Sequence, residues 1–159
     1  MSVAFTKEGD SEASAADLPD RPISPHPNFV TREGFAALEQ ALAAARSAYT
    51  AAQAAGDIGA DRTAMARATR DLRYYGARRA SAQLVDPAPE GGVIRFGSRV
   101  RLETEDGTPL SYRIVGEDEA DPARGLVSYI APMARALIGR SVGDTVTVAG
   151  RELEIVGVD

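Results

Sequence analysis

The sequence predicts an α+β protein, in which an N-terminal antiparallel helical hairpin precedes a small, mostly antiparallel β-sheet domain with one short helix. Two patterns support this prediction. Residues 31–83 carry apolar side chains at alternating intervals of three and four, the spacing that lines one seam of a coiled coil. From Val93 onward, apolar and polar residues alternate, as they do in half-buried strands. Residues 86–92 are rich in Pro and Gly, so we place a linker there and a second domain over residues 93–159.

The first 28 residues are predicted to form a disordered arm without catalytic function. Ser, Ala and acidic residues dominate its first part, and such a composition supplies too little apolar surface to fold. Four prolines then exclude a regular helix or a central strand: Pro19, Pro22, Pro25 and Pro27. Residues 18–28 could still dock along another protein surface, because a polyproline-like segment loses little conformational entropy when it binds.

The hairpin is predicted to cover residues 29–85. Thr31 is suited to open its first helix, and Glu33 in the first turn suits the helix dipole. Alanine is frequent on the seams and buries little area, so we expect the hairpin to be weakly stable alone and to rest on the second domain at its root. The first seam contains Phe35, Leu38, Ala41 or Leu42, Ala45, Tyr49 and Ala52, and the second contains Met65, Ala68, Leu72, Tyr75 and Ala82, with Arg79 as a polar interruption.

The predicted tip of the hairpin lies in residues 55–61, where the apolar repeat stops. Gly56 and Gly59 allow the backbone to reverse at little steric cost. Asp61 could cap the second helix, because its carboxylate can accept hydrogen bonds from the amides of the first turn. On the residues alone, Asp57 could be no more than a polar turn residue.

The second domain is predicted to contain five strands. They fall at residues 99–105, 110–115, 127–130, 145–149 and 152–158. The pair Asp106-Gly107 is a turn signal between the first two strands. Only residues 131–140 have a helical pattern, so we expect one short helix across a face of the sheet.

Composition excludes several classes of site. The chain has no cysteine, which excludes a disulfide framework and a thiolate metal site and indicates a cytoplasmic protein. His26 is the only histidine, so a histidine metal cluster is excluded and we expect no intrinsic metal or cofactor. Since the sequence has no apolar stretch long enough to span a membrane, we expect no membrane partner.

The formal net charge of −5 is divided unevenly along the chain. The N-terminal arm is acidic, whereas the second helix of the hairpin is basic. The helix could contact nucleic acid, nascent RNA or DNA, or an acidic protein surface, and the alternative is a solvated face of an amphipathic helix. The candidates for nucleic-acid contact are Arg62, Arg67, Arg70 and Arg73.

Two motifs of the second domain resemble a known family. The stretches are Tyr112-Arg113-Ile114-Val115-Gly116-Glu117-Asp118-Glu119-Ala120-Asp121, and Ile130-Ala131-Pro132-Met133-Ala134-Arg135-Ala136-Leu137-Ile138-Gly139 with a following Val142-Gly143-Asp144. They are similar to the C-terminal domain of the bacterial transcript cleavage factors GreA and GreB. The start and end of the hairpin also resemble GreB, at Val30-Thr31-Arg32-Glu33-Gly34-Phe35 and Leu84-Val85-Asp86, so the resemblance covers about residues 29–158.

The resemblance implies an FK506-binding-protein-like second domain that docks on bacterial RNA polymerase at the mouth of its secondary channel. By resemblance, the docking residues are Ile130, Ala131, Pro132, Met133 and Arg135; packing of Met133, Ala136 and Leu137 on the sheet is the alternative. In the family, acidic residues at the hairpin tip help hold a catalytic Mg²⁺ of the polymerase, so that backtracked RNA is hydrolysed. The chain would therefore be an accessory factor and not an enzyme itself.

The sequence departs from the family pattern at the tip. The family tip reads Gly-Asp, any residue, then Ser-Glu-Asn, whereas this chain has Gly56-Asp57-Ile58-Gly59-Ala60-Asp61. Asp57 matches, Ala60 stands at the glutamate position, and Asp61 could supply a displaced carboxylate. Both helices also look shorter than in the family by roughly a heptad, which would withdraw the tip by about 10 Å. The two resulting hypotheses are a transcript cleavage factor and a secondary-channel regulator that does not stimulate cleavage.

Two further classes remain as alternatives. An FK506-binding-protein-like fold invites the hypothesis of a peptidyl-prolyl isomerase, but fold alone does not carry function. The aromatic residues available after residue 92 are only Phe96, Tyr112 and Tyr129, which is few for a proline pocket. A hairpin that binds bare nucleic acid would do so with a steep salt dependence.

Overall fold

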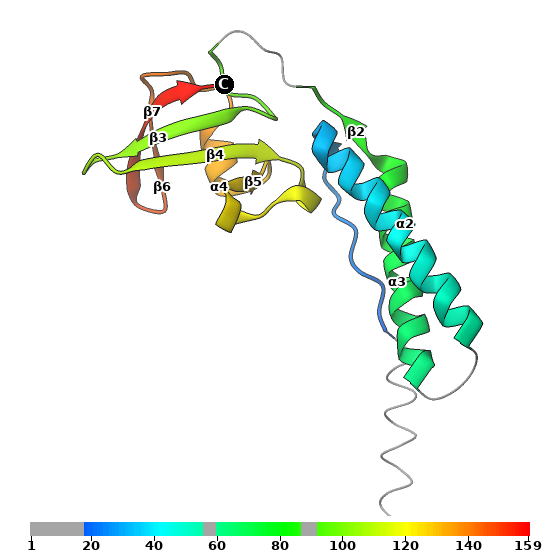
Figure 1. Ribbon diagram of the computed structural model, residues 1–159. Helices are drawn as coiled ribbons and strands as arrows, with labels where there is room; N and C mark the ends of the chain where they lie inside the picture. Colours follow the sequence, from blue (N-terminus) through cyan, green and yellow to red (C-terminus); the bar gives the residue numbers. More distant parts are fainter. Residues whose placement is uncertain (1–17, 56–59, 87–91) are drawn as a thin grey trace, which may run out of the picture. The chain divides into compact units, whose positions relative to one another are not determined.

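Two long helices and a five-stranded sheet account for most of the regular structure in the computed structural model, which describes residues 18–55, 60–86 and 92–159 (Figure 1). Contacts divide the chain into two units. The hairpin unit contains residues 36–81 and the segment that ends at His26, and the sheet unit contains residues 27–35 and 82–159. The root of the hairpin therefore belongs to the sheet unit, which is consistent with the expectation that the root rests on the second domain.

The helical hairpin is confirmed. Helix α2 covers Arg32–Ala55 and helix α3 covers Ala60–Ser81. Glu39 of α2 pairs with Arg79 of α3 through Oε1 and Nη2 at 3.0 Å, which explains the polar interruption in the second seam. The buried seam residues follow the predicted spacing on α2: Leu38, Leu42, Ala45 and Ala52.

Helix α3 is buried less than the sequence predicts. Ala68 is buried as expected, but Met65, Leu72 and Tyr75 are only partly buried. Arg78, by contrast, has only 2% of its surface exposed, although it is a charged residue. Within the residues that are described, neither long helix contains a stretch apolar enough to cross a lipid bilayer.

The larger sheet of the sheet unit has five strands in the order β5-β4-β3-β7-β6. The antiparallel pairs are β3–β4, β3–β7 and β6–β7, whereas β4 and β5 run parallel. The parallel pair arises because two short 3₁₀ helices, η1 (Glu117–Glu119) and η2 (Pro122–Arg124), carry the chain from the end of β4 back to the start of β5. The strands are β3 (Arg99–Thr104), β4 (Pro109–Val115), β5 (Leu126–Ser128), β6 (Thr145–Val148) and β7 (Arg151–Val158).

A second, two-stranded sheet was not predicted. Strand β1 (Phe29–Val30) pairs in parallel with β2 (Gln83–Leu84), at the two ends of the hairpin. The amide of Gln83 donates to the carbonyl of Asn28 at 2.8 Å, and the amide of Val85 donates to Val30 at 3.0 Å. Strands of two residues are too short for a periodic pattern to reveal them.

The short helix α4 (Pro132–Leu137) packs against one face of the sheet, as predicted (Figure 1). Alternate residues of β3 point into this core, since Val100 and Leu102 are fully buried while Arg99, Arg101 and Glu103 are exposed. The buried core consists of Ile94, Val100, Leu102, Ile114, Val127, Ala134, Leu137, Val146, Leu153 and Ile155.

Candidate functional site

The predicted docking residues lie in one turn and in the helix start that follows it. The amide of Ala131 donates to the carbonyl of Ser128 at 2.9 Å, which closes the turn after β5. Pro132 is the first residue of α4, where its fixed φ and missing amide suit a helix start. The structure therefore brings Ile130, Ala131 and Pro132 together with Arg135, one helical turn later.

The exposure of these residues separates surface from packing. Pro132 and Arg135 are exposed, whereas Ile130, Ala131 and Met133 are partly buried. Met133 packs against the core of the sheet unit, and Leu137 is completely buried. Leu137 therefore packs the helix on the sheet, as the alternative interpretation states. Met133 does so with the part of its side chain that is buried. Pro132 and Arg135 are the accessible members of the predicted docking surface.

Three exposed apolar side chains near α4 were missed in the sequence. Ile138, Val142 and Val93 keep 40%, 55% and 38% of their surface exposed. The two segments that carry them are paired, because Val93 bridges to Ser141 and the amide of Gly139 donates to the carbonyl of Ile94 at 2.8 Å. Ile138 follows α4 directly in the chain, and contiguous exposed apolar residues are typical of protein-binding surfaces.

The motif Val142-Gly143-Asp144 forms a turn into β6. The carboxylate of Asp144 accepts from the amide of Ser141 at 2.9 Å, and Gly143 has a φ of 93°, which favours glycine. The backbone of Asp144 accepts from Ile155 at 2.9 Å. These contacts give the motif a structural role, because it fixes where β6 begins beside β7.

The root of the hairpin is held by one carboxylate of the sheet unit. Glu119 Oε2 accepts from the amides of Thr31 and Gly116, both at 3.0 Å, and Oε1 accepts from the Thr31 hydroxyl. The same hydroxyl accepts from the amide of Gly34 at 3.1 Å, so Thr31 caps α2 as predicted. Thr31 is fully buried at this point. Glu119 therefore fixes the first turn of α2.

An aromatic cluster lies beside this root. The ring centroid of Phe29 is 6.0 Å from that of Phe96 and 5.4 Å from that of Tyr129. The hydroxyl of Tyr129 donates to the carbonyl of Pro27 at 2.5 Å. Phe96 and Tyr129, two of the three aromatic residues considered for a proline pocket, thus pack against Phe29 of β1. This packing argues against a proline-binding pocket formed by these residues.

Glu33 in the first turn of α2 faces Arg113, with Oε2 and Nη2 3.3 Å apart. A hydrogen bond with its own backbone amide, and then the Arg113 guanidinium, lower the pKa of Glu33. Because the folded pKa is the lower one, the stabilisation is present at neutral pH and is lost as the pH falls through the lowered pKa. We expect Glu33→Gln to reduce the acid sensitivity of the melting temperature slightly, measured by thermal melts between about pH 3 and pH 7.

The predicted tip stays a prediction. Asp57 lies outside the described residues, and only the backbone of Asp61 is described. Since α3 begins at Ala60, Asp61 lies within the first helical turn and not before it. A carboxylate in that turn suits the positive end of the helix dipole.

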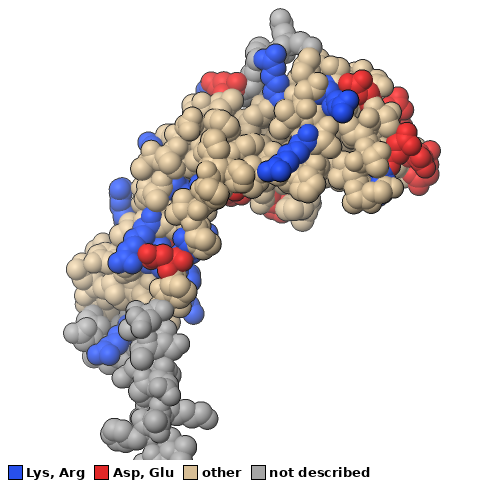
Figure 2. Space-filling model, turned by 180° about the vertical axis from the view of Figure 1, so that it is seen from behind, with Lys and Arg blue, Asp and Glu red and all other residues tan. Residues whose placement is uncertain are grey.

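The arginines of α3 differ in their surroundings. Arg62 and Arg67 are exposed. Arg70 Nε lies 3.5 Å from Asp71 Oδ1, and Arg73 Nη1 lies 3.1 Å from Asp20 Oδ1. Both arginines therefore already have an acidic partner. Figure 2 shows basic side chains along the hairpin and acidic side chains gathered at one end of the sheet unit.

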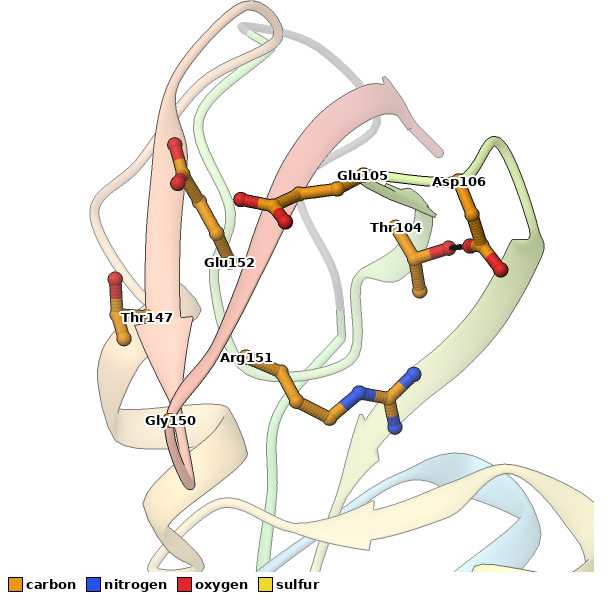
Figure 3. Close-up of a pocket in the computed structure, with 7 residues that line it drawn as sticks. All are labelled: Thr104, Glu105, Asp106, Thr147, Gly150, Arg151 and Glu152. Carbon is orange, nitrogen blue, oxygen red and sulfur yellow. Dashed lines mark hydrogen bonds between the residues drawn. The ribbon is translucent and has the colours of Figure 1, made fainter.

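An open cleft of about 450 Å³ lies between the β3–β4 and β6–β7 turns of the sheet unit (Figure 3). Asp106 turns back onto the Thr104 hydroxyl, a hydrogen bond that lowers the pKa of Asp106. Among the described residues, no cluster of acidic or histidine side chains could hold a metal ion. The cleft is therefore polar surface without a metal site. Its lining is Thr104, Glu105, Asp106, Thr147, Gly150, Arg151 and Glu152.

Comparisons with known proteins identify relatives of this chain. The sequence profile described as "Transcription elongation factor, GreA/GreB, C-term" matches residues 88–159. The chain is 52% identical over 85 positions to a GreA of Alkalilimnicola ehrlichii, of which it spans about half (54%), and 35% identical over 136 positions to GreB of Yersinia pestis, of which it covers 80%. Among solved structures, Gfh1 of Thermus thermophilus is 23% identical, with 84% of this chain and 99% of that chain covered and a TM-score of 0.41.

One relative matches over almost its whole length. GreA of Methylobacterium nodulans is 37% identical over 159 positions, which take in 81% of this chain and 94% of the relative. The aligned region is long enough to take in residues of both the hairpin and the sheet unit. The chain therefore belongs to the GreA/GreB family of transcription elongation factors.

Proposed function

We propose that this chain binds bacterial RNA polymerase at its secondary channel. The sheet unit docks on the polymerase, and the hairpin enters the channel. The observation that carries the proposal is the helical hairpin joined to a sheet unit, in a chain whose alignment with a GreA covers 94% of that relative. Pro132 and Arg135 are exposed at the start of α4 and provide the polymerase contact. Ile130, Ala131 and Met133 shape the turn that presents them.

In this proposal, the chain stimulates cleavage of backtracked RNA by supplying carboxylates to the active site of the polymerase. Asp57 at the tip is the first candidate, and Asp61 is the second. Magnesium prefers hard oxygen ligands, so a carboxylate brought beside it can help to hold it. The metal and the bond-breaking step belong to the polymerase, and the chain is an accessory factor.

A regulator that occupies the channel without stimulating cleavage is the second candidate function. Two observations favour it. Ala60 stands where the family has the tip glutamate. In addition, the alignment with the Methylobacterium protein has 159 positions, but only 81% of the 159 residues of this chain take part in it. About a fifth of the alignment positions are therefore gaps in this chain. This second candidate function places the missing positions in the hairpin, as a shortened finger requires.

Exchange of the two accessible docking residues tests the proposal. We expect Pro132→Ala combined with Arg135→Glu to weaken binding to RNA polymerase by about fivefold or more, because exposed anchors are lost without loss of core packing. The measurement is a titration of fluorescently labelled protein with core polymerase. Arg124→Glu is the matched control, since Arg124 is exposed in η2 outside the docking surface.

The two possible failures have different meanings. Unchanged affinity of the double variant would remove Pro132 and Arg135 from the interface. Absence of binding by the unaltered protein would refute the proposal of a polymerase factor itself.

A further inference from the structure

A segment without regular structure lies along α3 within the hairpin unit. Residues 18–26 form neither helix nor strand, yet they run beside α3 (Figure 1). The guanidinium carbon of Arg21 lies 3.8 Å from the ring centroid of Tyr74 and 5.1 Å from that of Tyr75. The neighbouring Asp20 accepts a hydrogen bond from Arg73 Nη1 at 3.1 Å.

The contacts of Arg21 are those of an arginine-binding site. Its Nη1 lies 3.6 Å from Asp71 Oδ1, so the guanidinium has an aromatic face and a carboxylate as partners. Only 36% of the Arg21 side chain and 35% of the Asp71 side chain are exposed, which weakens the screening by water. A hydrogen bond with Tyr75 raises the pKa of Arg21, whose guanidinium is charged at neutral pH like that of any arginine.

The site is built into one side of α3. Tyr74 and Tyr75 follow Asp71 by three and four residues, the spacings that bring a side chain beside that of Asp71 on the helix surface. The two tyrosine rings meet edge to face, with centroids 5.2 Å apart, so each restrains the other. A planar guanidinium that enters this site finds the stacking surface already formed.

We propose that Asp71, Tyr74 and Tyr75 form a docking site on α3 for an extended protein segment in which an arginine follows an acidic residue. The chain's own residues 18–26 are the intramolecular occupant, with Arg21 in the site and Asp20 on Arg73. Prolines at 19, 22 and 25 keep this segment extended, which lowers the entropy lost on docking. The site is thus masked until a competing segment from a partner displaces the occupant.

The occupant is held weakly enough to exchange. Its contacts are partly exposed ion pairs and one cation–π contact, and such contacts weaken as salt rises. A tethered segment acts as a ligand at an effective concentration of roughly millimolar. A free peptide with similar contacts should therefore compete measurably with residues 18–26 for the site. This inference does not depend on the proposed binding to polymerase.

A competition experiment with the full-length chain tests this inference. The ligand is a synthetic peptide with the sequence of residues 18–26, and the readout is the NMR signals of the Tyr74 and Tyr75 rings. We expect the peptide to bind the variant Asp20→Asn/Arg21→Ala, whose own segment is released, and to bind the unaltered chain about fivefold more weakly. A peptide in which alanine replaces the arginine should not bind. Adding Tyr74→Leu to the released variant should abolish binding, with circular dichroism as the control for helix content.

Four results would overturn the inference, and the first three concern the peptide. These are equal peptide affinity for the unaltered and released chains, no binding to the released chain at about 10 mM peptide, and binding of the alanine peptide as tightly as the arginine peptide. A fourth is selective binding of a single-stranded RNA probe, without peptide binding, by the released variant, which would assign the face to nucleic acid. None of these outcomes changes the polymerase titration, so the two proposals fail separately.

Discussion

Gly34→Ala is expected to lower the free energy of unfolding by about 2 kcal/mol, although alanine is ordinarily the better residue within a helix. A Cβ at this position would lie 2.0 Å from the carboxyl carbon of Glu119 and 2.3 Å from its Oε2. The carboxylate would have to leave the Thr31 amide and hydroxyl and the Gly116 amide. Urea denaturation followed by circular dichroism measures the loss.

The cause can be isolated with a double-mutant cycle. In a Glu119→Ala background the space beside Gly34 is vacated, so adding Gly34→Ala should cost nothing or stabilise by up to about 1 kcal/mol. Gly76→Ala in α3 is the matched control, because a Cβ there meets nothing within 4 Å. It should stabilise by about 0.5–1 kcal/mol. An equal cost of Gly34→Ala in both backgrounds would show that Glu119 is not what excludes the methyl group.

The cap of α2 illustrates what the sequence could predict. Thr31 was expected to open the helix, because capping is a local contact that short patterns report. Its partner Glu119 is 88 residues away in the chain, and nothing in the sequence pairs the two. Helices and most strands follow from periodicity alone. The parallel pairs β1–β2 and β4–β5 depend on long-range contacts or on a crossover, so they could not be predicted.

The candidate site was predicted in part for the same reason. The motif at residues 130–135 located the turn and the start of α4, but only the structure separates exposed Pro132 from Met133, which packs on the core. Valine is usually buried, so the sequence could not predict that Val142 keeps 55% of its surface exposed. Arg73 was counted as a cation for nucleic acid, and its pairing with Asp20 joins two segments far apart in the chain.

Ala60→Glu is expected to raise the rate of transcript cleavage by the polymerase by about tenfold or more, a change of roughly 1.4 kcal/mol in the activation barrier. In the proposed function, Asp57 is the only tip carboxylate that matches the family pattern, and a second one at the glutamate position adds an oxygen ligand of the kind that Mg²⁺ prefers. The measurement is the release of short 3′ RNA fragments from a stalled, backtracked elongation complex. Asp57→Ala should abolish the release by both the parent and the variant.

Ala44→Glu is the control for added charge, because Ala44 is exposed on α2 and removed from the tip in sequence. It should leave cleavage unchanged. If Ala60→Glu binds polymerase with parental affinity and still releases no RNA, a missing carboxylate cannot be the reason for inactivity. The reach of the finger would then be the limiting property, since a carboxylate several ångströms from a metal adds no ligand to it. That result would contradict the cleavage proposal and leave the channel regulator as the function of this chain.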